Sequence, residues 1–175
     1  MTTRTRLLTL CSSFLLTACQ ASLPPLETVE YVDLEQFMGD WYVIANIPTF
    51  VEKGAHNAIE SYRLDEDGTI ATRFTFNKGS FDGMEKEYQP RGFIRNTETN
   101  AEWGMQFVWP FKGDYRIIYV SEDYSTTIIG RNKRDYVWLM ARSPELSDES
   151  YAEAVSLIAA AGYDTTQLQR VPQRW

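Results

Sequence analysis

Apolar and polar residues alternate one by one along most of the chain, the pattern of a strand with one buried face. Segment 69–77 shows it most clearly, because Ile70, Thr72, Phe74 and Phe76 share one face and small or polar residues share the other. Segments with strand character are predicted at 41–47, 57–64, 69–77, 88–95, 102–109, 115–122, 125–132 and 136–142.

Turn-forming residues separate many of these segments, as in 96–100 and 110–114. The order therefore suggests successive hairpins in an up-and-down meander. Eight antiparallel strands that close on themselves leave no exposed edge and enclose room for one small ligand. The predicted fold class is all-β, an eight-stranded up-and-down antiparallel β-barrel.

Two helical segments interrupt this alternation. At 147–162, Ser147 is a candidate N-cap, Gly162 follows the last turn, and apolar residues recur at helical spacing. This pattern predicts one C-terminal α-helix packed against the outside of the barrel. Residues 33–39 are expected to form a single helical turn, with Asp33 as its cap and Gly39 as its stop.

The N-terminal residues differ from the rest of the chain. Arg4 and Arg6 precede a mostly apolar run of ten residues, shorter than the roughly 20 residues that span a bilayer. This composition is typical of a secretory signal peptide, predicted at 1–18. We expect the new N-terminus and an extended tether at 19–31 and the folded domain at 32–175.

Cysteine and charge counts limit the possible partners. Cleavage before Cys19 would remove Cys11, so no disulfide could form within the domain. The net charge of the chain is −7, and it becomes −9 without Arg4 and Arg6. This acidity argues against a nucleic-acid surface and against electrostatic docking on anionic lipid.

The sequence Leu-Thr-Ala-Cys at 16–19 resembles the lipobox of bacterial lipoproteins. The resemblance implies that Cys19 is acylated, and Gln20 in the next position implies sorting to the outer membrane, with the domain on its periplasmic face. An ordinary signal peptide with an incidental cysteine is the alternative. Several acyl chains together would hold the protein firmly, whereas one gives only marginal binding.

Three motifs arrive in the order and spacing of the lipocalin family. Gly39 and Trp41 open the first predicted strand, Asp123 and Tyr124 lie between the sixth and seventh, and Arg142 ends the eighth. The chain most resembles bacterial outer-membrane lipocalins, the group akin to apolipoprotein D, although Glu122 replaces the usual Thr of the second motif.

The resemblance implies that these motif residues are structural. In the family the tryptophan lies across the closed end of the barrel, and the arginine stacks on it. A guanidinium over an indole contributes about 0.5–2 kcal/mol. Gly39 would allow the preceding turn to approach closely, because it has no side chain.

The alternation also predicts a ligand pocket, if the apolar face of each strand points inward. A filled core is the alternative, and we expect it near Trp41. Nearer the mouth, the many aromatic residues favour a cavity. The predicted lining is Val43, Ala45, Ala58, Tyr62, Ile70, Thr72, Phe74, Phe76, Trp103, Met105, Phe107, Tyr115, Ile117, Tyr119, Trp138 and Met140.

Glu60 shares the inward face with Ala58 and Tyr62. A buried, unpaired carboxylate is costly, so it should have an arginine, a tyrosine hydroxyl or water as its partner. One hypothesis makes Glu60 the polar handle of the pocket or one half of an internal ion pair. The alternative is a bulge that turns it to solvent.

Residues 48–56 connect the first two strands across the expected open end, where Phe50 and Val51 would form a lid or a membrane-facing lip; an irregular surface loop is the alternative. His56, the single histidine, has no adjacent acid and is expected to be exposed rather than a general base. No metal-ligand set, cofactor motif or catalytic spacing is recognisable.

The sequence therefore predicts a lipid-anchored, non-enzymatic lipocalin. The resemblance implies a fatty acid or a lysophospholipid as the ligand, with storage, transport or membrane repair as the role. The alternatives are an interaction module with a filled barrel and a lipocalin-fold enzyme. A homodimer remains open.

Overall fold

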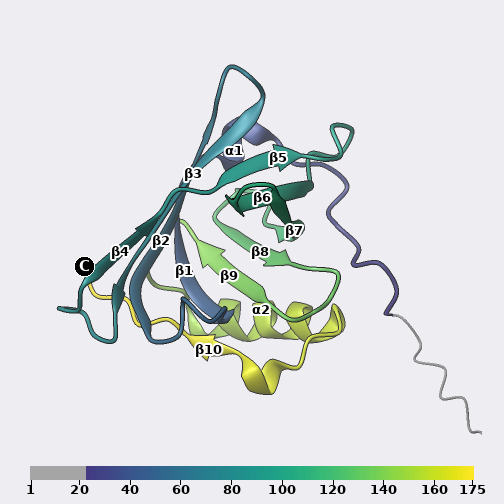
Figure 1. Cartoon of the computed structure of the whole chain (residues 1–175). Helices are drawn as coiled ribbons and strands as arrows, with labels where there is room; N and C mark the ends of the chain where they lie inside the picture. Colours follow the sequence, from purple (N-terminus) through teal and green to yellow (C-terminus); the bar gives the residue numbers. More distant parts are fainter. Residues whose placement is uncertain (1–22) are drawn as a thin grey trace, which may run out of the picture.

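The computed structural model describes residues 23–175; residues 1–22, which include Cys19, lie outside the described part (Figure 1). Its helices are α1 (Leu34–Phe37), α2 (Asp148–Ala160) and the short 3₁₀ helix η1 (Thr165–Gln167). Its strands are β1 (Gly39–Ile47), β2 (Ala55–Leu64), β3 (Thr69–Lys78), β4 (Glu85–Tyr88), β5 (Arg91–Ile94), β6 (Glu102–Val108), β7 (Phe111–Val120), β8 (Thr126–Gly130), β9 (Val137–Ala141) and β10 (Gln169–Arg170).

The strands form a closed antiparallel barrel, as predicted. Strands β1, β2, β3, β5, β6, β7, β8 and β9 pair successively in this order, and β9 pairs with β1 to close the wall. The fourth predicted strand is split into β4 and β5, which pair with successive parts of β3. Pro90 lies at the division, and proline lacks the N–H that a continuous ladder requires. Counting β4 and β5 as one wall position gives the eight-stranded barrel.

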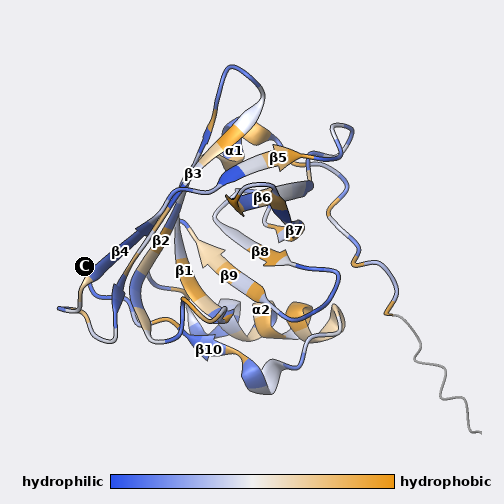
Figure 2. Cartoon of the chain, in the orientation of Figure 1, coloured by the Kyte–Doolittle hydropathy of each residue, from blue (hydrophilic) through white to orange (hydrophobic). Residues whose placement is uncertain are grey.

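Helix α2 lies outside the barrel against β1, β8 and β9 (Figure 1). The Ser147 hydroxyl accepts a hydrogen bond from the Ser150 N–H at 3.1 Å, which caps the helix as predicted. Ile158 and Ala154 are buried there, in a second core outside the barrel interior that also contains Ile128 and Leu139. Hydropathy follows this arrangement, since β9 is largely apolar and the outlying β4 is polar (Figure 2).

Two predicted pocket residues, Ala45 and Tyr119, belong to this outer core, so the prediction that they point inward was wrong. The register shifts between Val43 and Ala45 in β1 and between Ile117 and Tyr119 in β7. An extra residue in a strand reverses the face of every following side chain.

The motif residues meet at the closed end of the barrel. The Arg142 guanidinium lies 3.8 Å from the centre of the Trp41 ring and donates to the main-chain carbonyls of residues 36, 37, 38 and 40. Gly39 has φ +95°, and a Cβ there would lie 3.4 Å from an Arg142 nitrogen. Phe37 of α1 packs on Trp41 from inside, with ring centres 5.1 Å apart.

Tyr124 ties the N-terminal segment to this end, because its hydroxyl accepts from the Asp33 N–H at 2.8 Å. The Asp33 carboxylate in turn caps α1, as predicted. Asp123 accepts hydrogen bonds from Ser121 and Ser125, which lower its pKa to about 2.

The C-terminal segment 169–175 completes the wall between β1 and β2. Pairing of these strands covers only residues 39–42 and 59–62. Beyond that point Arg170 pairs with Ala45, and the Pro172 carbonyl accepts from the Asn57 N–H at 2.8 Å. The Gln173 amide donates to the carbonyls of Val43 and Ala58, which joins the two strands.

Candidate functional site

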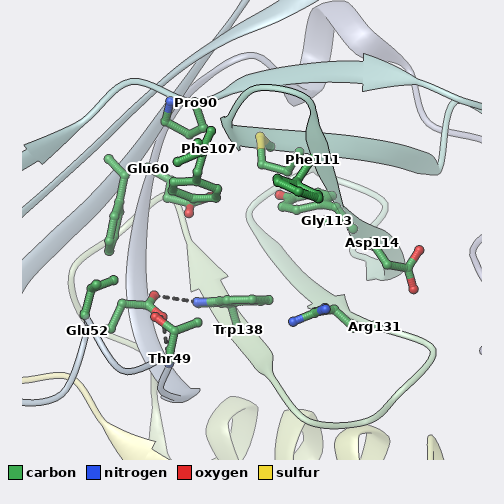
Figure 3. A pocket seen from close by; sticks show the side chains of 15 residues that line it. Thr49, Glu52, Glu60, Pro90, Phe107, Phe111, Gly113, Asp114, Arg131 and Trp138 are labelled. Carbon is green, nitrogen blue, oxygen red and sulfur yellow. Dashed lines mark hydrogen bonds between the residues drawn. The ribbon is translucent and has the colours of Figure 1, made fainter.

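A cavity of about 320 Å³ occupies the end of the barrel opposite α1 (Figure 3). Apolar side chains form most of its wall, and a few polar groups converge on it. Its lining is Thr49, Val51, Glu52, Glu60, Phe74, Pro90, Met105, Phe107, Val108, Phe111, Gly113, Asp114, Tyr115, Arg131 and Trp138. A cavity of this size and character suits one small apolar ligand.

Glu60 and Tyr115 form the polar part of the cavity floor, and Tyr62 lies next to both in the packed barrel core. The Tyr62 hydroxyl donates to one Glu60 carboxyl oxygen and lies 2.6 Å from the Tyr115 hydroxyl. No hydrogen bond from residues 23–175 reaches the other carboxyl oxygen of Glu60, and this side chain lines the cavity. A tyrosine hydroxyl was one of the three partners predicted for Glu60 from the sequence, beside an arginine and water.

Burial, together with the nearby Glu52, raises the pKa of Glu60 to about 8. Removal from bulk water disfavours the charged carboxylate, and a second carboxyl opposes it further. Burial and Glu60 likewise raise the pKa of Tyr115 well above its ordinary value. At neutral pH the floor therefore contains an uncharged carboxyl group at Glu60 beside the neutral phenol of Tyr115.

Glu52 belongs to the loop between β1 and β2, and it is only 4% exposed. One of its oxygens accepts from the Trp138 indole N–H at 2.7 Å, and the other accepts from the N–H and hydroxyl of Thr49. Figure 3 shows the Glu52–Trp138 bond at the side of the cavity. These bonds fix the indole as a flat apolar wall and fasten the loop to β9.

Arg131 lies on the other side of Trp138, at the cavity edge (Figure 3). Its Nη1 lies 3.4 Å from the Asp135 carboxylate, and its guanidinium lies 5.2 Å from the centre of the Tyr136 ring. Within the described residues, its buried Nε has no hydrogen-bond partner. Asp114, also on the lining, is held by Arg116 and by the Asn132 N–H.

Six of the predicted pocket residues line this cavity: Glu60, Phe74, Met105, Phe107, Tyr115 and Trp138. The others that point inward do not line the cavity. Thr72 is buried, and the packed barrel core contains Val43, Ala58, Tyr62, Ile70, Phe76, Trp103, Ile117 and Met140. The rings of Trp103 and Tyr115 stack 5.2 Å apart there. The barrel is thus filled near Trp41 and hollow near its mouth.

The remaining lining residues were not predicted. Thr49, Val51 and Glu52 belong to a loop, where no periodicity assigns a direction to a side chain. Arg131 lies just after β8, and Phe111 and Gly113 lie in the part of β7 next to a register shift of the β6–β7 pair. The sequence did place residues 48–56 across the open end, and Val51 of that loop lines the cavity.

The described residues contain neither a cluster of three or more metal-ligating side chains nor a helix long and apolar enough to cross a membrane. The Nδ1 of His56 donates a hydrogen bond to the Gly54 carbonyl oxygen at 3.1 Å, and the ring packs on Phe81. It is not among the cavity residues.

A closed antiparallel barrel with one end sealed by an arginine-capped tryptophan and the other hollow is the architecture of lipocalins. The lipocalin-like domain model matches residues 32–173, and the chain belongs to this family.

Among known proteins, the chain is 29% identical to the outer membrane lipoprotein Blc of Escherichia coli (strain K12) over 166 residues, covering 93% of this chain and 92% of Blc. It is 29% identical to temperature-induced lipocalin-1 of Arabidopsis thaliana over 160 residues, covering 85% and 83% of the two chains. The solved structure of insecticyanin from the tobacco hornworm, Manduca sexta, has a TM-score of 0.66 at 15% identity, covering 85% and 84%, and shows the shared fold.

Proposed function

We propose that this lipocalin binds one small hydrophobic ligand, a fatty acid or a lysophospholipid, and carries or stores it in the bacterial envelope. The observation that supports this most is the cavity of about 320 Å³ with its mainly apolar wall. Each square ångström of apolar ligand surface that leaves water contributes roughly 25 cal/mol, which drives uptake without a covalent step.

We further propose that Cys19 carries acyl groups and anchors the protein to the periplasmic face of the outer membrane. Two observations support this: the Leu-Thr-Ala-Cys sequence at 16–19 and the similarity, along nearly the whole chain, to a protein named as an outer membrane lipoprotein. Mass spectrometry of the membrane-extracted protein tests it, since acylation adds a lipid mass that Cys19→Ser removes.

Binding rather than catalysis suits the cavity chemistry. Its acid, Glu60, is hydrogen-bonded to a tyrosine, and the described lining residues include no serine, cysteine or histidine. Incubation with a lysophospholipid tests this reading, because an enzyme would release a free fatty acid while a carrier would return the ligand intact.

Native mass spectrometry of delipidated protein tests ligand binding. With palmitate or lysophosphatidylcholine, we expect one ligand per chain. An interaction module with a filled barrel would take up neither, and that result would contradict the proposal.

A further inference from the structure

Large apolar side chains project into solvent around the mouth of the cavity. Trp109 is 82% exposed, Phe111 76% and Phe50 83%, although residues of this kind are normally buried. We call this group the apolar rim; its members are Phe50, Val51, Phe107, Val108, Trp109 and Phe111.

The apolar rim is continuous with the cavity. Val51, Phe107, Val108 and Phe111 have one part of their surface in the cavity lining and another exposed to solvent. An apolar ligand could therefore pass from an apolar phase at the mouth to the cavity without meeting a polar barrier at the rim.

The N-terminal segment leads from the closed end of the barrel to this same mouth. Val32 donates to the Thr99 carbonyl between β5 and β6, at the closed end, and Val29 donates to Ile117 midway along β7. Leu26 then donates to Asn132, and the Pro24 carbonyl accepts from Arg134, both in the β8–β9 connection at the open end. Four residues lie between Cys19 and Pro24, so the five steps along the chain reach at most about 18 Å.

Charge at the mouth differs from charge on the whole molecule. The connections at this end, residues 48–54, 79–84, 107–112 and 131–136, contain five basic and three acidic side chains, whereas the chain has net charge −7. Two of the three acids, Glu52 and Asp135, are already engaged with Trp138 and Arg131. With five basic against three acidic side chains, the mouth is less repelled by anionic lipid than the acidic molecule as a whole.

We propose that the apolar rim docks on the membrane leaflet that holds the N-terminal anchor, so that ligand moves between bilayer and cavity through the docked mouth. This inference rests on the proposed function for its ligand and on the proposed acylation of Cys19 for its anchor. The short tether keeps the mouth near the leaflet, and the aromatic side chains enter the interfacial layer.

Depth-dependent quenching tests the orientation. The acylated full chain is placed in vesicles of phosphatidylethanolamine and phosphatidylglycerol with brominated acyl chains, and tryptophan emission is measured. We expect strong quenching that Trp109→Phe reduces by at least half, while Trp175→Phe, on the outer wall, leaves it in place. Equal quenching in wild type and Trp109→Phe would overturn the proposal.

Ligand transfer tests the consequence. Phe50→Ser combined with Trp109→Ser alters two rim residues that do not line the cavity. We expect transfer of palmitate from vesicles to slow by about ten-fold, because apolar contact with the bilayer is lost. Leu64→Ser, at the closed end, should change nothing. Unchanged transfer in the double variant would overturn the proposal.

Two further outcomes separate this inference from its alternatives. A wild-type dimer in solution that the double variant dissociates, without quenching by brominated lipid, would assign the rim to a second copy and overturn membrane docking. Quenching of Trp109 in a protein that takes up no ligand by native mass spectrometry would support docking and reject the proposed ligand-binding function instead.

Discussion

Glu60 shows how one position acquires unusual chemistry from its neighbours. It lies in β2 opposite Trp41 and Phe74, and its polar contact is the Tyr62 hydroxyl. Glu52 is the acid that opposes its ionisation. The register shift in β2 lies between His56 and Ile59, and the pairing with β3 is regular from Ile59 to Leu64, so Glu60 shares the inward face of Tyr62.

The raised pKa of Glu60 makes stability depend on pH. Below pH 4.5 the carboxyl is protonated in both the folded and unfolded chains; between 4.5 and about 8 only the folded chain keeps the proton. The free energy of unfolding should therefore fall as pH rises through this window, by up to about 1.4 kcal/mol per pH unit, and level off above it.

Urea unfolding at pH 5 to 9 measures this slope. We expect Glu60→Gln to lose this pH dependence of the free energy of unfolding. Glu66→Gln, in the exposed β2–β3 turn, is the control and should keep it. Identical slopes in wild type and Glu60→Gln would contradict the assignment.

Ligand choice should follow the same titration if Glu60 is the polar handle. Above pH 8 its carboxylate would repel the carboxylate of palmitate, so we expect palmitate affinity to fall by about ten-fold between pH 7 and 9. The uncharged 1-hexadecanol should show no such fall, and neither should palmitate with Glu60→Gln. Titration calorimetry checks this, and a fatty-acid panel bound equally by wild type and Glu60→Gln at both pH values would refute the handle.

Arg142 holds the closed end through its shape as much as its charge. Lysine would keep the charge but lose most of the carbonyl bonds and the flat stack on Trp41. We expect Arg142→Lys to lower the free energy of unfolding by about 2 kcal/mol. Denaturant melts should show no comparable loss for Arg63→Lys, a 77% exposed arginine; equal melts for the two variants would argue against the cap.

At the scale of elements, alternation predicted the strands and the capped helix because burial on one face imposes a period. It failed at Ala45 and Tyr119, since a bulge depends on how two strands fit together. It also did not foresee β10, whose pairing with β1 depends on the course of a distant segment. Polar residues such as Gln169 and Arg170 carry no strand signal of their own.

The candidate site was predictable only where it lies on strands. The alternation of inward and outward side chains predicts that Phe74, Met105 and Tyr115 line the pocket. Glu52 belongs to a loop, where no such alternation applies. The alternation also cannot distinguish residues of the packed half of the barrel from those of the hollow half, because the strands have inward apolar faces in both halves. Trp103 and Tyr62 fill space that the sequence left open.

The C-terminal segment should act as a strap across β1 and β2. Removal of residues 169–175 would free the Asn57 N–H and the Val43 and Ala58 carbonyls. Hydrogen exchange should then accelerate in 43–47 and 55–58 while β7 and β8 stay protected. Unchanged exchange in β1 and β2 would show that the strap is not needed, and Gln173→Ala provides a milder test.

In the whole molecule, one end of the barrel is closed and packed, and the other end opens into the cavity. At one end α1, Trp41 and Arg142 close the interior with aromatic packing and hydrogen bonds. At the other, the cavity opens among exposed apolar side chains. This polarity allows a stable wall and an exchangeable ligand in a domain without an internal disulfide among residues 23–175.

If an apolar ligand occupies this cavity, it lies against Trp138, and its binding should change the fluorescence of that residue. It is the one cavity-lining tryptophan among the described residues. Titration of delipidated protein with a brominated fatty acid should quench tryptophan emission, saturate at one equivalent, and lose most of its amplitude in Trp138→Phe. No quenching with excess ligand, or full quenching in Trp138→Phe, would show that the fatty acid does not bind in this cavity.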